Sequence, residues 1–233
     1  MKLIIIRHGD PDYTVDSLTP TGWKEAELLS ERISGMNIKD FYVSPLGRAR
    51  DTASCTLEKC GRSAEILDWL REFDIRIDDR SVTWDMLPAE WTAVPEYYDK
   101  NKWYEVPAMK NAGMKSGIDE VNNGLDEILE NHGYKREGNI YRAVNPNEDT
   151  IVFFCHFGVQ CVMLGHLLGI SPMVLWHGFI APPASVTTLI TEERREGKAY
   201  FRLNSFGDTS HLENPSFAGR FCEMYSNESQ RHD

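Results

Sequence analysis

Hydrophobic residues form two short uninterrupted runs in this chain, and each run stops at a polar, chemistry-bearing residue. Residues 3–6 (Leu-Ile-Ile-Ile) precede Arg7, His8 and Gly9, and residues 151–155 (Ile-Val-Phe-Phe-Cys) precede His156. Continuous apolar runs of this length are too short to span a membrane and are typical of strands buried on both faces of a sheet. Ligands of open α/β sheets bind at the carboxyl ends of the strands, so we expect the residues after both runs at one site.

Helical patterns follow the predicted strands. Thr19 and Pro20 are typical of an N-cap and a first helical residue, and a helix ending near Gly35 has an apolar face of Trp23, Ala26, Leu29 and Ile33. Residues 41–43 predict a second strand, and Ser44-Pro45 repeats the cap-and-proline start before a helix with a buried face of Leu46, Ala49, Ala53 and Leu57. The run at 151–155 precedes a helix that closes at Gly169 and carries Val159, Val162, Met163 and Leu167.

The remaining pattern completes an α/β architecture. Short strands are predicted at 64–67, 185–191 and 199–206, a hairpin at 133–143 and an amphipathic helix at 116–130. We therefore predict a three-layer sandwich with a mostly parallel central sheet flanked by helices, in a single domain of residues 1–222. Residues 223–233 are polar, and we expect them to form a C-terminal tail.

An aromatic-rich segment interrupts this pattern at about residues 78–115. It has no clean period, yet tryptophan and tyrosine are concentrated in it, at positions 84, 91, 97, 98, 103 and 104. This composition excludes a disordered linker and predicts an ordered insertion of short helices or turns. Two interpretations are open: a satellite hydrophobic cluster that covers the sheet, or a lid that selects the organic part of a substrate.

Charge and cysteine content argue against a nucleic-acid-binding, membrane-bound or disulfide-bonded protein. With 25 basic and 36 acidic residues the net charge is -11, which argues against nucleic acid or an anionic membrane as a partner. The chain opens with no signal-peptide pattern, and no apolar run reaches the roughly 20 residues of a membrane helix. Its five cysteines lack metal-ligand spacing and are expected to be reduced. We therefore expect a cytoplasmic protein and leave its oligomeric state open, a homodimer included.

Basic residues in an acidic chain are candidates for binding an anion. Arg7 adjoins His8, and Arg48 lies in the first turn of the second predicted helix, where the backbone amides and the helix dipole also favour negative charge. These residues, with Glu72 and His156, form a set that resembles the histidine phosphatase superfamily, also called the phosphoglycerate mutase-like family. The resemblance covers roughly residues 2–70 and 150–189, and the middle of the chain matches poorly.

The resemblance implies a phosphatase that needs neither metal nor cofactor and hydrolyses a small phosphate monoester. His8 would attack phosphorus in line and form a phosphohistidine intermediate. The phosphate oxygens would be bound by Arg7, Arg48, His156 and the backbone amide of Phe157.

One carboxyl group must protonate the leaving alcohol and later activate water. Glu72 matches the glutamate of the family, and the position after the second histidine, an aspartate in some branches, is Phe157 here. Asp10 and Asp74 are the alternative acids. We expect His166, His177 and His211 to be mostly structural, with His211 at most near the pocket.

Two other functions remain open at this point. A phosphoglycerate mutase-type isomerase would use the same nucleophile, but we see no matching basic segment for a second phosphate and a carboxylate, so hydrolysis is favoured. A non-catalytic phosphate-binding module would be indicated by the absence of His8 or Arg48, and both are present.

Overall fold

The first predicted strand lies inside an eight-stranded sheet. In the computed structural model, which describes residues 1–77 and 81–212, the strand order is β5-β4-β10-β1-β11-β12-β9-β8. The parallel half comprises β5 (Glu65–Ile66), β4 (Asp40–Val43), β10 (Thr150–Cys155) and β1 (Lys2–Arg7). The antiparallel half comprises β11 (Val186–Arg195), β12 (Lys198–Asp208), β9 (Ile140–Ala143) and β8 (Tyr134–Glu137). The sheet is therefore mixed, with parallel strands in half of it.

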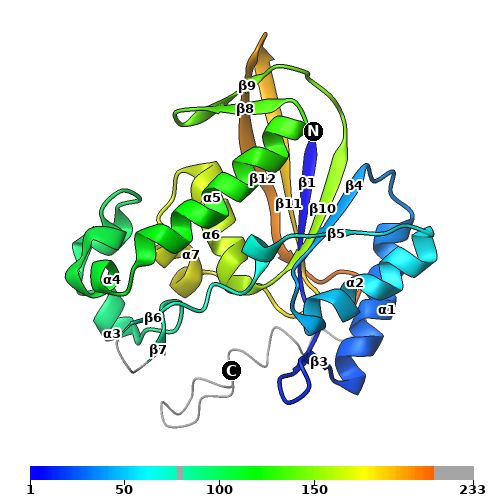
Figure 1. Ribbon diagram of the computed structural model, residues 1–233, viewed down its shortest axis with the longest axis horizontal. Coiled ribbons are helices and arrows are strands. Elements are labelled where there is room, and N and C mark those ends of the chain that lie inside the picture. The colour runs from blue at the N-terminus through cyan, green and yellow to red at the C-terminus, as the bar shows by residue number, and fades with distance from the viewer. Residues whose placement is uncertain (78–80, 213–233) are drawn as a thin grey trace.

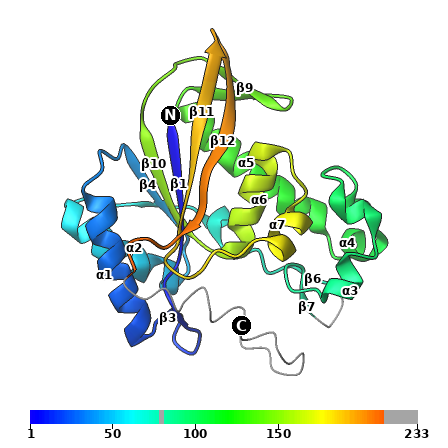
Figure 2. The ribbon, with the colours of Figure 1, turned by 180° about the vertical axis from the view of Figure 1, so that it is seen from behind.

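Alternate residues of β1 face two helical layers. Ile4 and Ile6 pack with α1 (Pro20–Ser34) and α2 (Gly47–Cys60), whereas Leu3 and Ile5 pack with α5 (Met114–Asn131) and α6 (Phe157–Leu168). All four β1 side chains are at most 1% exposed, as expected for a strand covered on both faces. Figures 1 and 2 show the two helical layers on either side of the sheet, which confirms the predicted α/β class and layering.

The helix starts differ in how well the sequence predicts them. Thr19 caps α1 as expected, because its hydroxyl accepts the Gly22 amide at 3.1 Å. The prediction that Trp23 lies on the buried face of α1 is wrong, since Trp23 is 38% exposed. The prediction that Ser44 caps the second helix is also wrong: α2 begins at Gly47 after the N-cap Leu46. Ser44 instead extends the ladder of β4 by donating its amide to the Phe154 carbonyl.

The predicted insertion is ordered where it is described. Its elements are β6 (Arg76–Ile77), β7 (Ser81–Val82), α3 (Pro88–Trp91), η2 (Pro95–Tyr98), η3 (Trp103–Glu105) and α4 (Pro107–Asn111). The shorter elements elsewhere are β2 (Pro11–Asp12), β3 (Ser17–Leu18), η1 (Asp68–Leu70) and α7 (Pro172–Gly178). Tyr97 and Trp103 are buried in the core on the α5 and α6 side of the sheet, so part of the insertion is packing.

Two further expectations concern the chain ends and membranes. The tail expected at 223–233 lies outside the described residues, as does the end of the predicted domain. Within residues 1–77 and 81–212, no helix combines the length and the hydrophobicity needed to cross a bilayer.

Candidate active site

Residues predicted to act on phosphate gather at the carboxyl end of the parallel strands. The ladder continues beyond β1 because the His8 amide donates to the Cys155 carbonyl at 2.9 Å. The His8 and His156 rings consequently lie side by side, with centroids 5.1 Å apart. In Figure 1 this edge of the sheet is its lower end, on the side of β3 and opposite the N-terminus. The structure thus brings together two histidines from segments far apart in the sequence.

His8 is held in one tautomer by its own turn. The ring is only 2% exposed, and its Nδ1 lies 2.7 Å from the Gly9 carbonyl oxygen. Because a carbonyl oxygen only accepts, Nδ1 carries the hydrogen and the lone pair of the neutral ring is on Nε2. Burial, followed by the positive charge of Arg7, lowers the pKa of His8 well below its usual value. His8 is therefore a neutral imidazole with a free nucleophilic lone pair at neutral pH.

Two helices fix the turn that carries His8. The Gly9 amide donates to Thr52 Oγ1 at 2.9 Å, and that hydroxyl donates to the Arg48 carbonyl at 2.7 Å within α2. On the other side, a Cβ on Gly9 would lie 2.9 Å from the Gly22 carbonyl oxygen in α1. Glycine is needed at position 9 because no side chain fits between the turn and α1.

His156 is anchored through its other ring nitrogen. Its Nε2 lies 2.8 Å from Ser44 Oγ, and Nδ1, which is buried, has no hydrogen-bond partner among the described residues. Burial first, and then the charges of His8, Arg48 and Arg7, lower the pKa of His156 well below its usual value. A buried orphan nitrogen in a neutral ring is costly unless a ligand satisfies it, so Nδ1 marks a place for a polar ligand atom.

The two predicted arginines reach the site from different segments. Arg7 Nη1 donates to the Ala181 carbonyl at 2.7 Å, and its guanidinium carbon lies 5.7 Å from the centroid of the Phe157 ring. Arg48, the second residue of α2, forms an ion pair with Asp16 at 2.6 Å. The positive charges of both arginines act on the pKa values of His8, His156 and Glu72, so the two cations lie near the same three side chains.

Glu72 lies against the start of α6. Its Oε1 accepts the Phe73 amide at 2.8 Å and the Val159 amide at 3.2 Å, so the carboxyl caps a helix end that also follows His156. Burial raises the pKa of Glu72, and the Phe73 amide and the Arg7 charge oppose that rise. A buried carboxyl whose pKa is raised is suited to proton transfer.

The remaining predicted site residues are also placed by the structure. Phe157 is the first residue of α6, and its ring lies beside Arg7; binding of phosphate by its amide stays a prediction. Asp10 accepts the Thr19 hydroxyl at 2.7 Å at the start of α1, and Asp74 is exposed. The positive charges of Arg7 and Arg48 both act on the pKa of Glu72, which favours Glu72 as the candidate acid.

Sequence reasoning missed several residues that shape this site. Ser44 was interpreted as a helix cap, whereas its hydroxyl contacts His156. No sequence pattern indicates Asp16 or Gly158: Asp16 contacts Arg48, and a Cβ on Gly158 would lie 2.5 Å from Glu72 Oε1. The apolar-run pattern points to the ends of strands, so it carries no signal for residues that contact the site from loops and helices.

The other histidines have partners elsewhere. His166 Nε2 bonds Asp126 at 2.9 Å, and His177 contacts the Met86 amide and stacks on Trp91. Arg32 donates to His211 Nδ1 at 3.2 Å, and burial and Arg32 lower the pKa of His211 to about 4. Within residues 1–77 and 81–212, no three histidine, cysteine, aspartate or glutamate side chains cluster as a metal site would require.

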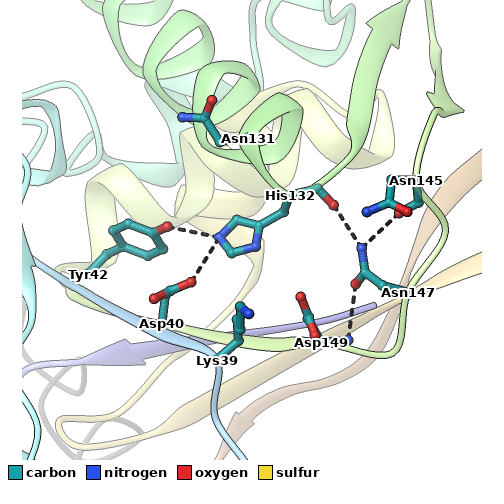
Figure 3. A pocket seen from close by; sticks show the side chains of 8 residues that line it. All are labelled: Lys39, Asp40, Tyr42, Asn131, His132, Asn145, Asn147 and Asp149. Atoms are coloured by element: carbon teal, nitrogen blue, oxygen red, sulfur yellow. Dashed lines mark hydrogen bonds and ion pairs between the residues drawn. The ribbon is translucent and has the colours of Figure 1, made fainter.

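A second polar region lies at the opposite end of the sheet. A pocket of about 370 Å³ opens where β4 and β10 begin, and Figure 3 shows Tyr42 and Asp40 on its wall, both directed at one ring nitrogen of His132. His132 Nε2 lies 2.9 Å from Tyr42 Oη and 3.6 Å from Asp40 Oδ2. None of the predicted site residues lines this pocket, so it does not belong to the candidate active site.

Comparison with known proteins identifies the family and the fold of the chain. The sequence profile of the histidine phosphatase superfamily, branch 1, matches residues 3–204. The chain is 26% identical over 210 residues to phosphoserine phosphatase 1 of Hydrogenobacter thermophilus, covering 84% of this chain and 89% of that protein. A 2,3-bisphosphoglycerate-dependent phosphoglycerate mutase of Thermoplasma acidophilum is 42% identical over 64 residues, 23% of this chain, and the match spans about a third (32%) of that protein.

Solved structures show the same fold. A mutant phosphoserine phosphatase of Entamoeba histolytica, in complex with phosphoserine, superposes with a TM-score of 0.61 at 21% identity, covering 91% of this chain and 98% of that one. A mycobacterial glucosyl-3-phosphoglycerate phosphatase gives 0.62 at 16% identity, covering 89% and 99%. The chain belongs to the histidine phosphatase superfamily, which confirms the family predicted from residues 7–9, Arg48, Glu72 and His156. This membership and the phosphatases among its relatives support the predicted hydrolase of phosphate esters.

Proposed function

We propose that the protein hydrolyses a small phosphate monoester through a phosphohistidine formed on His8, without a metal ion or cofactor. The observation that carries the proposal is the His8 contact with the Gly9 carbonyl, which leaves the Nε2 lone pair for attack. Arg7 and Arg48 supply the positive charge that a phosphoryl group requires. His156 Nδ1, oriented by Ser44, supplies a further donor.

In the first step, Nε2 of His8 attacks phosphorus in line with the ester oxygen. The new P–N bond forms as the P–O bond to the alcohol breaks, and Glu72 in its protonated form gives its proton to the departing oxygen. The raised pKa of Glu72 supports this role, because more of the acid stays protonated. The alcohol leaves, and the phosphoryl group remains on His8.

In the second step, water attacks the phosphohistidine. Glu72, now a carboxylate, takes the proton from the attacking water as the P–N bond breaks, and inorganic phosphate leaves. His8 returns to its neutral form with the Nδ1 hydrogen still directed at Gly9. Arg7 and Arg48 stay protonated in both steps, so they neutralise the negative charge of the phosphoryl oxygens and transfer no proton.

Turnover of p-nitrophenyl phosphate and a panel of metabolite phosphates, with and without EDTA, tests the proposal. We expect activity that EDTA does not change and that His8→Ala abolishes. His166→Ala is the matched control, because it removes an imidazole at the other end of α6 that bonds Asp126. If His8→Ala and His166→Ala had equal effects, or if the native protein hydrolysed nothing in the panel, the proposed mechanism would be wrong.

A mutase activity is the second candidate, and the match to the Thermoplasma acidophilum mutase favours considering it. It would use the same His8 but return the phosphoryl group to a bound phosphoglycerate. Incubation with 3-phosphoglycerate and 2,3-bisphosphoglycerate distinguishes the two activities. Release of inorganic phosphate supports the phosphatase, whereas formation of 2-phosphoglycerate without phosphate release supports the mutase.

We also propose a cytosolic location. The support is chemical: Cys55, Cys60, Cys155 and Cys161 are all unpaired, which suits a reducing compartment. Cell fractionation with a tagged copy of the full chain tests this location.

A further inference from the structure

The carboxylate of Asp16 lies across the start of α2. Its Oδ2 accepts the Gly47 amide at 2.7 Å, and its Oδ1 accepts Arg48 Nη1 at 2.6 Å. Although partial burial acts in the opposite direction, the Gly47 amide and the Arg48 guanidinium hold the pKa of Asp16 below its usual range. Asp16 is therefore an anion at neutral pH, bound to the residue that the proposed function assigns to phosphate.

The local chain conformation fits this contact closely. Asp16 has a φ of 48°, a left-handed conformation that costs most residues energy and that aspartate tolerates better than most. A Cβ on Gly47 would lie 1.9 Å from the Asp16 carbonyl oxygen, so glycine alone lets the loop approach α2. Next to it, the Ser17 hydroxyl donates to Asp51 Oδ2 at 2.5 Å. The loop is thus fastened to α2 on both sides of the ion pair.

The contact selects one edge of the Arg48 guanidinium. Nη1 is taken by Asp16, whereas Nε is buried and has no hydrogen-bond partner among the described residues. Nε and Nη2 form the edge that pairs with two oxygens of a phosphate. Because Asp16 holds Nη1 and the buried Nε has no partner among the described residues, the Nε and Nη2 edge of Arg48 is oriented to bind a ligand. His156 Nδ1 is likewise buried without a partner there.

We propose that Asp16 is a positioning residue, which holds Arg48 so that its Nε and Nη2 edge meets the phosphoryl group in the transition state. The inference rests on the proposed function. It has a specific kinetic consequence, because Asp16 also places a negative charge near the site. Removing the charge should not weaken the binding of inorganic phosphate, whereas loss of orientation should weaken stabilisation of the transition state.

The test compares Asp16→Asn with Asp12→Asn. Asparagine tolerates the left-handed conformation, so the first variant removes the charge with little change in backbone strain. Asp12 is in the same hairpin, and its carboxylate contacts only Thr14 among the hydrogen bonds of the described residues. The second variant therefore removes one negative charge without touching Arg48.

The readouts are kcat for p-nitrophenyl phosphate, the Kd of inorganic phosphate, the inhibition constant of vanadate and the thermal midpoint. For Asp16→Asn we expect kcat to fall about tenfold or more and vanadate, a transition-state mimic, to bind correspondingly more weakly. Phosphate should bind as tightly as before or more tightly, and Asp12→Asn should match the native protein.

Three results would overturn the inference. An unchanged or raised kcat in Asp16→Asn would mean that the carboxylate is neutral or inhibitory. Equal weakening of phosphate and vanadate, with a fall in the thermal midpoint, would mean that Asp16 only stabilises the fold. If the native protein hydrolysed no phosphate ester, the proposed function would be wrong, and the inference, which rests on it, would be wrong as well.

Discussion

His8 and His156 lie with ring centroids 5.1 Å apart and planes tilted by 56°, and each ring is anchored through a different nitrogen. His8 is bonded at Nδ1 to the Gly9 carbonyl, and His156 at Nε2 to Ser44 Oγ. The Leu46 amide donates to the same hydroxyl oxygen at 3.3 Å, so the hydroxyl hydrogen is available to His156. We infer that the Ser44 hydroxyl donates to Nε2 of His156, so that both rings carry their hydrogen on Nδ1; His8 then offers a lone pair at Nε2, and His156 offers an N–H donor at Nδ1.

Ser44→Ala should remove the control of the His156 tautomer. We expect kcat for p-nitrophenyl phosphate to fall about tenfold, the value of roughly one hydrogen bond, with a smaller change in KM. Nitrogen NMR of the His156 ring measures the cause directly, because the hydrogen should redistribute between Nδ1 and Nε2. Ser54→Ala is the control, since that hydroxyl donates to the Asp51 carbonyl within α2. An unchanged tautomer in Ser44→Ala would contradict the assigned role.

The pH dependence of kcat/KM should reflect Glu72 on its alkaline side. The competent form in the first step is protonated, and burial raises the pKa of Glu72, so activity on esters of poor leaving groups should fall as pH rises through that raised pKa. On the acid side, burial lowers the pKa of His8 well below 6.5, so no loss of activity is expected near pH 6.5.

Glu72→Gln supplies the corresponding mutation. It should abolish the alkaline limb and reduce turnover of alkyl phosphates far more than that of p-nitrophenyl phosphate, whose leaving group needs little protonation. Asp74→Asn, a change at an exposed carboxylate two residues away, should leave both substrates unaffected. Equal losses on both substrates in Glu72→Gln would exclude it as the general acid.

We expect some aromatic residues of the insertion to stabilise the fold and others to determine substrate preference. Trp103 is 1% exposed and packs edge-on against Trp176 with ring centroids 5.4 Å apart, whereas Trp84 lies beside the Gly158 position that Glu72 also contacts. Trp103→Phe should lower the free energy of unfolding by about 1–3 kcal/mol and leave substrate preference unchanged. Trp84→Ala should change the ratio of kcat/KM values across the phosphate panel. A constant ratio in Trp84→Ala would favour the purely structural interpretation.

The apolar pattern predicts both the buried strands and the site residues at their ends, because a continuous apolar run marks the strand and the polar residue that ends the run marks the strand's carboxyl end. A run buried on both faces must be continuous, and the polar residue that ends it lies at the edge where ligands bind. His8 and His156 were found in this way. The parallel share of the sheet was overestimated, because a hairpin such as 133–143 has no local signal for which sheet edge it joins.

The apolar pattern along the sequence does not predict which distant segments contact one another in the folded chain. The Asp16 and Arg48 contact spans 32 residues, and the contact between Glu72 and the Val159 amide spans 87. Ser44 was misassigned for a related reason: a serine before a proline satisfies the pattern of a helix cap, and only the folded chain brings His156 within reach of its hydroxyl.

Gly158→Ala, a substitution in α6, tests whether Glu72 must keep its position against that helix. The new Cβ would lie 2.5 Å from Glu72 Oε1 and 2.9 Å from Trp84 Cδ1, both too close for ordinary contact. Alanine is otherwise the better helix residue by about 1 kcal/mol, so we expect nearly unchanged stability and a displaced carboxyl. A displacement of this kind should reduce kcat by about 10- to 100-fold for poor leaving groups.

Gly35→Ala is the matched control for that variant. Gly35 follows α1 with a φ of -77°, and a Cβ there would meet no atom within 4 Å. It should leave kcat and stability close to native values. If Gly158→Ala kept native turnover while Glu72→Gln did not, Glu72 would need no fixed position against α6, and its contact with the Val159 amide would serve the fold alone.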